Sequence, residues 1–156
     1  MLQEIKEKLN SLKETKEFKD FIQNSDKSFL NSIMLDPNPN FNFYNPEIDK
    51  FFTFYIDDQV TIEESGVFRK EKKYLFELNI DEIKIDFDQV KDIIKEILFK
   101  NKNSEKKSMI ILKQEEVPIW GIILITSELN VISLKINALT SNIIEEKVQN
   151  ILKFRT

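Results

Sequence analysis

The stretch that decides the fold is FFTFYID at residues 51–57. Successive side chains of a β-strand point to opposite faces, so every second residue shares a face. One face is then wholly apolar and consists of Phe52, Phe54 and Ile56. The opposite face carries Phe51 and Tyr55 on either side of Thr53. The pattern predicts an antiparallel strand with one face in the core and the other uncovered.

A second stretch repeats this alternation 80 residues further on, as VISLKIN at residues 131–137. The same offset aligns the two stretches without a gap. Three apolar positions then coincide with those of the first stretch, namely Ile132, Leu134 and Ile136. A pattern that recurs at a fixed offset indicates an internal repeat. We therefore expect two copies of one structural unit.

The elements expected around the first stretch are one helix and a run of strands. Apolar residues recur at helical spacing over residues 2–23, and the strand patterns cover residues 28–35, 41–44 and 51–57, although residues 28–33 equally fit an extension of the helix. One more short strand is indicated within residues 60–68. The run Arg69–Lys73, which follows, is predicted to be a solvated loop rather than a phosphate-binding patch because it also contains a glutamate.

The second unit begins with a stronger helix signal. Asp86 followed three residues later by Gln89 is typical of a capping box at a helix start. Strands are expected afterwards at residues 109–114, 119–126 and 131–137. From about Asn142 the chain is expected to form a final amphipathic helix, with one apolar face made of Ile144, Val148, Ile151 and Leu152.

The predicted fold class is therefore α+β, an antiparallel sheet with helices on one face, built as two α-β-β-β repeats plus a C-terminal helix. The first half covers residues 1–68, a connector covers 69–85, and the second half with the C-terminal helix covers 86–156. Whether the halves share one sheet or pack side by side is left open.

Composition excludes several classes of chemistry. The 156-residue chain has no histidine and no cysteine, which removes disulfides, zinc–thiolate sites and imidazole catalysis. Its two glycines cannot build a glycine-rich phosphate loop. A net charge of −4 argues against nucleic acid as a partner. The most apolar window, residues 117–124, is too short to span a membrane, so we expect a cytoplasmic protein.

Neighbouring acidic residues are the remaining candidates for catalysis or metal binding. Such pairs occur at five places, for example Glu63-Glu64 and Glu115-Glu116. Their spacing matches no metal-binding loop, and a chain with 27 acidic residues pairs many of them by chance. We therefore expect a solvated surface, no cofactor, no metal and no enzyme activity.

Aromatic residues are the better candidates for contact with a partner, and these are Phe51, Tyr55, Tyr44 and Trp120. Phe51 and Tyr55 either form a recognition patch on the outer face of their strand or lie beneath the helix over residues 2–23. Trp120 lies in a strand that is apolar on both faces, which favours core packing over a binding role.

The segment at residues 132–144, ISLKINALTSNII, resembles the end of a PepSY-type domain. Such domains close with an apolar-alternating strand, an Asp/Asn-Ala pair and a Thr-Gly turn. Asn137-Ala138 and Thr140 match this pattern, whereas Ser141 stands where such domains carry glycine. The resemblance covers about residues 86–146, and more weakly 2–57.

PepSY-type domains are non-enzymatic and are associated with binding and restraining peptidases. The resemblance therefore implies a regulatory module whose partner is a protein or peptide, with a peptidase as one such partner. An alternative of a different class is a small acidic homodimer similar to a secretion chaperone, which fits the length, the acidity and the mixed helix–strand order.

Overall fold

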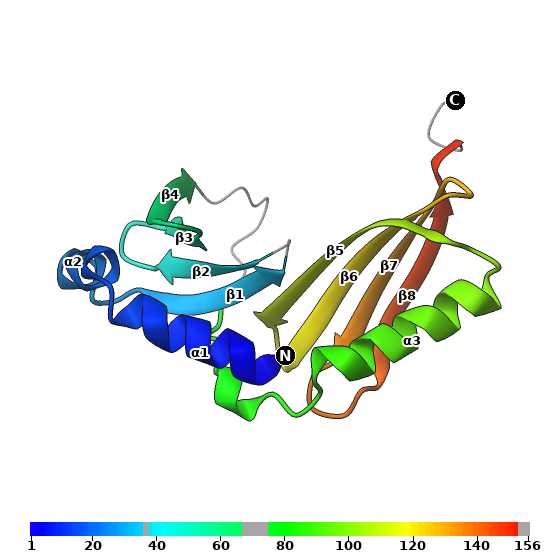
Figure 1. Ribbon diagram of the computed structural model, residues 1–156, viewed down its shortest axis with the longest axis horizontal. Coiled ribbons are helices and arrows are strands. Elements are labelled where there is room, and N and C mark those ends of the chain that lie inside the picture. Colours follow the sequence, from blue (N-terminus) through cyan, green and yellow to red (C-terminus); the bar gives the residue numbers. More distant parts are fainter. Residues whose placement is uncertain (36–37, 67–74, 153–156) are drawn as a thin grey trace.

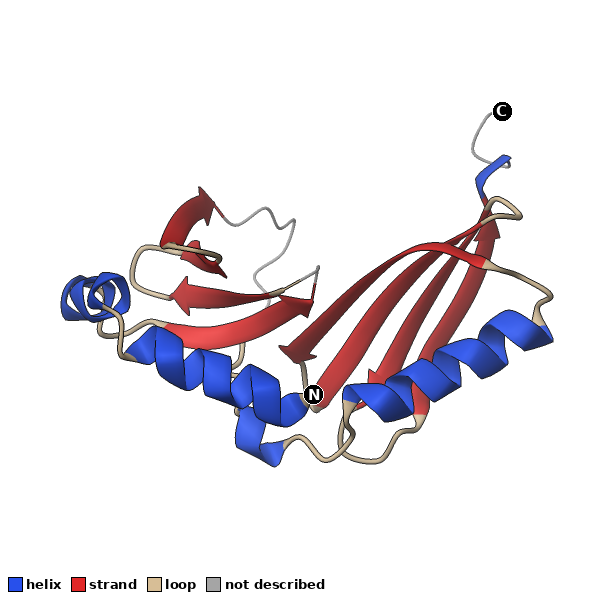
Figure 2. Ribbon diagram, in the orientation of Figure 1, coloured by secondary structure: helices blue, strands red, loops and turns tan. Residues whose placement is uncertain are grey.

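The computed structural model describes residues 1–35, 38–66 and 75–152 (Figures 1 and 2). Within them the chain forms three α-helices, one short 3-10 helix and eight strands. In chain order these are α1 (Leu2–Lys13), α2 (Lys16–Asn24), β1 (Phe29–Leu35), β2 (Pro39–Asn45), β3 (Lys50–Ile56), β4 (Val60–Gly66), η1 (Ile80–Glu82), α3 (Phe87–Lys100), β5 (Glu105–Gln114), β6 (Pro118–Thr126), β7 (Asn130–Asn137) and β8 (Ile143–Asn150).

All eight strands belong to one antiparallel sheet, so the fold is α+β and the two halves share a sheet. The strand order is β4-β3-β2-β1-β5-β6-β7-β8. β1 pairs with β5 at the centre, from Ser32 opposite Lys113 to Leu35 opposite Ile110. The first strand of one half therefore lies beside the first strand of the other, and β4 and β8 form the two edges (Figure 1).

The core follows from the alternation of side chains along these strands. Residues that pair directly across antiparallel strands point to the same face. One such row crosses six strands and consists of Phe54, Phe41, Ile33, Leu112, Trp120 and Ile136. Each of the six side chains is completely buried. The alternation predicted for Phe52, Phe54 and Ile56 is thus confirmed, since all three pack in or against the core.

The helices cover this buried side of the sheet. In the first half, the rings of Phe18 and Phe21 in α2 lie 5.5 and 5.1 Å from the ring of Phe54. In the second half, the ring of Phe87 in α3 lies 5.9 Å from that of Trp120. α1 and α3 run along the same side of the sheet in Figure 2.

The helix predicted over residues 2–23 is divided in two by Thr15. The Thr15 hydroxyl accepts a hydrogen bond from the backbone N–H of Phe18 and donates one to the carbonyl of Leu12. Thr15 is thereby the N-cap of α2, in extended backbone geometry that ends α1. The break lets α2 lie at a different angle from α1, so that its phenylalanines reach β2 and β3.

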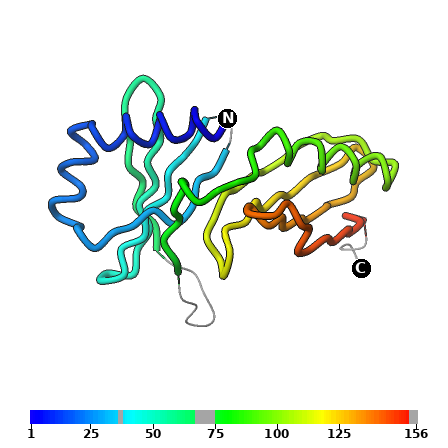
Figure 3. Tube along the Cα trace, turned by 90° about the horizontal axis from the view of Figure 1, so that it is seen from below, coloured from blue at the N-terminus to red at the C-terminus, as the bar shows by residue number. Residues whose placement is uncertain are grey.

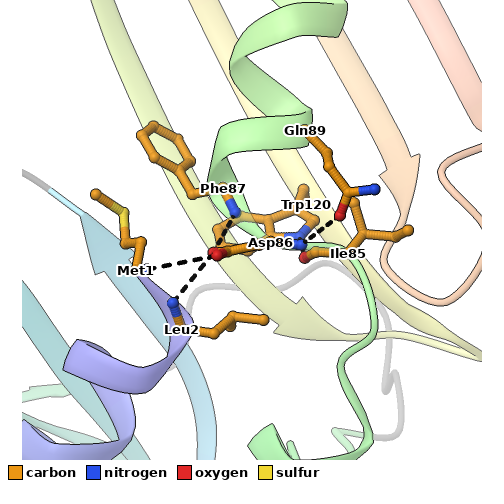
Figure 4. A network of polar contacts seen from close by, with 7 residues as sticks. All are labelled: Met1, Leu2, Ile85, Asp86, Phe87, Gln89 and Trp120. Carbon is orange, nitrogen blue, oxygen red and sulfur yellow. Dashed lines mark hydrogen bonds and ion pairs between the residues drawn. The ribbon is translucent and has the colours of Figure 1, made fainter.

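Asp86 caps α3 as the sequence predicts, with Gln89 completing the capping box. The same carboxylate also reaches the start of α1 (Figure 4). One oxygen accepts the backbone N–H of Phe87 at 2.7 Å and that of Leu2 at 3.1 Å, and the other lies 3.4 Å from the N-terminal nitrogen. Partial burial acts to raise the pKa of Asp86, but these hydrogen bonds and the ammonium charge together lower it.

The connector between the halves is held by backbone hydrogen bonds to both of them. The Leu78 N–H donates to the carbonyl of Leu30 in β1, and the Ile85 N–H donates to the carbonyl of Ala138 after β7. Figure 3 shows residues 75–86 crossing from the first half to α3. The basic run Arg69–Lys73 lies outside the described residues.

The predicted C-terminal helix is wrong, because residues 143–150 form strand β8. β8 pairs along the whole of β7, from Asn130 opposite Asn150 to Ile136 opposite Ile143. Without β8, the backbone N–H and C=O groups along one side of β7 would lack partners. The hydrogen-bonding requirement of the β7 backbone therefore outweighs the local helical spacing of Ile144 and Val148.

The expectation of three strands in each half is also wrong, because each half has four. β4 corresponds to the further short strand expected within residues 60–68, and β8 replaces the helix. Each half runs from a helical segment into a four-stranded meander, yet their pairings differ. Phe54 pairs with Phe41, whereas Leu134, which lies 80 residues after Phe54, pairs with Ile122. The internal repeat itself stays a prediction.

Candidate functional site

The side of the sheet away from the helices is the main candidate for contact with a partner, and we call it the open face. It is made of the residues that alternate with the buried row. Their central row crosses the same six strands and consists of Tyr55, Asn40, Met34, Ile111, Gly121 and Lys135. None of the three described α-helices covers this side in Figure 2.

An apolar strip runs along the open face over the junction of the two halves. Its members are Met34, Met109, Ile111, Ile123, Ile125 and Val131. Met109 and Ile123, which pair across β5 and β6, are 40% and 42% exposed, and the others are half-buried. A contiguous apolar patch that stays partly exposed often marks an interaction site.

Gly121 shapes the middle of the strip. A β-carbon at this position would lie 2.9 Å from the Cγ2 atom of Ile111 on the neighbouring strand. The missing side chain lets Ile111 lean over the backbone of β6. Ile111 and Ile123 therefore lie on one surface that no side chain at position 121 interrupts.

A group of charged residues borders the strip on the β7 and β8 side. The Lys135 ammonium lies 2.8 Å from a Glu115 oxygen and 3.9 Å from a Glu145 oxygen, and Glu145 also pairs with Lys147 at 2.7 Å. The hydrogen bond that Lys135 donates to Glu115 raises the pKa of Lys135, and the hydrogen bond that Lys147 donates to Glu145 lowers the pKa of Glu145. These contacts hold the charged groups in place at the edge of the strip.

A chain of hydrogen bonds borders the strip on the first-half side. The Thr53 hydroxyl donates to the Asn42 amide oxygen at 3.0 Å, and the Asn42 amide nitrogen donates to the Ser32 hydroxyl at 3.3 Å. These three residues pair across β3, β2 and β1. The polar groups on this part of the face thus satisfy one another.

Three of the aromatic residues singled out from the sequence lie on the open-face side of the sheet, but Tyr44 is buried there, at 7% exposure, and only Phe51 and Tyr55 are partly exposed. The ring of Phe51 lies 5.1 Å from that of Tyr44, whose hydroxyl donates to Asp49. The Tyr55 hydroxyl donates to Glu63 at 3.0 Å, and this hydrogen bond, with partial burial, raises the pKa of Tyr55. Helix α2 packs on the other side of the strand, so these residues do not lie beneath it.

Trp120 does not lie near the other three predicted aromatic residues. Its side chain is fully buried on the helix side, and its indole N–H donates to the carbonyl of Ile85 at 2.9 Å (Figure 4). It therefore takes the core position that its apolar strand favoured, and it presents no surface to a partner.

The residues of the apolar strip were not among the site residues predicted from the sequence. The signal that pointed to them was strand 119–126, which is apolar on both faces although its neighbours alternate. Such a strand indicates either a second covered face or an exposed apolar surface. Ile123 belongs to the exposed surface.

The described residues contain no group of three or more acidic side chains arranged to hold a metal ion. Among them, no helix is long and apolar enough to cross a membrane. Comparison of the chain with protein-family models, with curated proteins and with solved structures found no match.

Proposed function

We propose that this protein is a non-catalytic module that binds a protein or peptide through its open face. The observation that carries the proposal is the apolar strip, in which Met109 and Ile123 stay about two-fifths exposed in the middle of an eight-stranded sheet. Burying such side chains against a partner contributes about 25 cal/mol for each Å² removed from water.

The charges on the open face add a preference for the partner's chemistry. Lys107 and Lys113 lie on this face, and neither makes an ion pair within 4.0 Å of another described residue. Together with Lys147, the charge of Lys113 nevertheless acts on Glu145 and helps to lower its pKa. Lys107 is therefore the lysine most available to a carboxylate of a partner. The proposed partner therefore offers apolar side chains flanked by acidic groups.

The proposed kind of partner is a peptidase, on the strength of the PepSY-type resemblance at residues 132–144. This segment forms β7, the following turn and the start of β8. The proposal includes a regulatory role, in which binding at the open face restrains the partner. Phe51 and Tyr55 extend the binding surface beyond the polar row of Ser32, Asn42 and Thr53.

The proposed duplication of the chain accounts for the continuity of this surface. Both halves run from a helical segment into a four-stranded meander, and their first strands pair at the centre. The strip lies over that junction, where Met34 pairs with Ile111. An experimental structure whose β1–β4 and β5–β8 units fail to superpose would contradict the duplication.

The test compares Ile123→Glu with Ile62→Glu, two isoleucines that are each 42% exposed. Ile62 is a matched control because it pairs with Phe54 on the helix side of edge strand β4. Peptides selected from a displayed library on the wild-type protein should lose at least about tenfold in affinity with Ile123→Glu, or about 1.4 kcal/mol, and keep it with Ile62→Glu. Equal losses, or no selected peptide, would contradict the proposal.

Light scattering on the same variants tests the alternative of a homodimer. The proposal expects a monomer at all concentrations. A stable dimer that Ile123→Glu dissociates and Ile62→Glu preserves would mean that a second copy of the chain occupies the open face, in favour of the chaperone-like class.

A further inference from the structure

A cleft lies beside α1, and we call it the α1 cleft. It has a volume of about 1150 Å³ and lies between α1, the connector residues 76–82 and the β5–β6 turn. None of the six residues of the apolar strip lines it. A concave site with an apolar base and a few polar groups is the usual form of a binding site.

The floor of the α1 cleft is apolar. It is lined by core residues that come from both helices of the first half, from the sheet and from the connector, namely Leu9, Phe18, Leu30, Phe43 and Leu78. Phe76 stands at the rim and is 45% exposed, which is high for a phenylalanine beside a core. The floor residues are themselves only 3–7% exposed, so a bulky apolar side chain of a ligand would bury mainly the Phe76 ring.

The rim of the α1 cleft is acidic. Five carboxylates and only two ammonium groups, those of Lys6 and Lys13, line it. The carboxylates are Glu77, Asp81, Glu82, Glu115 and Glu116. Asp81 lies 3.5 Å from Lys6, and Glu115 is held by Lys135 at 2.8 Å. Glu77, Glu82 and Glu116 form no ion pair with another described residue.

Hydrogen bonds fix the wall of the cleft that carries these charges. The Leu78 N–H donates to the carbonyl of Leu30 at 2.7 Å, and the Asn31 amide donates to the carbonyl of Phe76 at 3.2 Å. The Asn79 side chain accepts the N–H of Asp81 at 3.0 Å. The positions of Phe76, Glu77 and Asp81 are therefore set by the sheet, which lowers the ordering cost of binding.

We propose that the α1 cleft binds a cationic amphipathic peptide segment, one that presents lysine or arginine together with large apolar side chains. The acidic rim complements its charge, and the apolar floor takes its side chains. The same rim repels phosphate groups and acidic peptides. This site is distinct from the apolar strip, although Glu115 lies at the rim of the cleft and also belongs to the charged group that borders the strip.

Fluorescence anisotropy with a short labelled peptide of leucine and lysine tests the inference. Glu77→Gln combined with Glu116→Gln should weaken binding at least about fivefold. The matched control is Asp92→Asn with Glu96→Gln, which removes two exposed carboxylates from α3 and gives the same net charge. Equal weakening by both pairs would show attraction to overall charge and would overturn the inference.

Three further comparisons separate the cleft from other surfaces. Phe76→Ala should weaken binding of the peptide, while Phe99→Ala, at a phenylalanine that is 88% exposed on α3, should leave it unchanged. A peptide with glutamate in place of lysine should not bind the cleft. If Ile123→Glu abolishes binding of the lysine peptide, the peptide occupies the open face and the cleft assignment is wrong.

Discussion

Ser141 adopts a backbone φ of 70°, in the left-handed region that side chains other than glycine rarely occupy. The turn between β7 and β8 requires this conformation. The Asn137 amide oxygen accepts the N–H of Leu139 at 2.8 Å, and the Asn137 carbonyl accepts the N–H of Ser141 at 2.9 Å. Glycine is the residue that adopts such a φ without a steric penalty.

Ser141→Gly should stabilise the protein by about 0.5–1 kcal/mol, because glycine adopts this φ without steric cost. The matched control is Ser133→Gly in the middle of β7, which should destabilise by a similar amount through lost conformational restriction. Urea denaturation of the two variants measures both effects. A loss of stability on Ser141→Gly would contradict the strain assigned to this turn.

At the scale of elements, the packing of β6 against β5 depends on a position without a side chain. Ile111 leans over Gly121, whereas Gly66 at the end of edge strand β4 has open space around its α-carbon. The two glycines of the chain therefore differ in what an added methyl group would meet.

Gly121→Ala should cost about 1 kcal/mol, because the new β-carbon forces Ile111 to shift in a packed region. Gly66→Ala should be neutral or slightly stabilising, since it restricts the unfolded chain without a clash. Thermal unfolding measures both. In the Ile111→Ala background, Gly121→Ala should no longer lower the stability. If the stability losses of the two substitutions add instead, the contact with Ile111 is not the cause of the cost of Gly121→Ala.

At the scale of the whole molecule, the two halves are joined by the β1–β5 pairing, by the buried row of side chains and by Asp86. Ile33 and Leu112 pair across the junction, and both are completely buried. Such a shared core favours cooperative unfolding of the halves as one unit.

Trp120 is the single tryptophan and lies in the second half, so its fluorescence reports unfolding there. Phe54→Leu removes part of a fully buried ring in the first half and should destabilise by roughly 1–3 kcal/mol. If the halves unfold together, the fluorescence transition should shift to lower denaturant together with the circular dichroism transition. A fluorescence midpoint that stays unchanged would show that the halves unfold independently.

The sequence predicted the strands well wherever the local alternation of side chains agrees with the hydrogen bonding of the backbone in the sheet. Phe52 and Phe54 face the core, and the expected strands at 51–57 and 131–137 correspond to β3 and β7. The capping pair Asp86 and Gln89 marked the start of α3 because a cap is a local hydrogen-bonding motif. The division at Thr15 carried a similar local signal, but the apolar spacing on either side of it obscured the cap.

The C-terminal segment and the candidate site depended instead on contacts between distant residues. Ile144 and Val148 fit helical spacing, but residues 143–150 form a strand because they pair with the β7 backbone. Likewise, the apolar strip exists because the pairing of β1 with β5 places Met34 beside Ile111. The alternation of residues and the start of α3 can be read from the chain alone, because they depend on residues close together in sequence. Which faces are covered depends on the three-dimensional arrangement, because exposure is set by how distant segments pack.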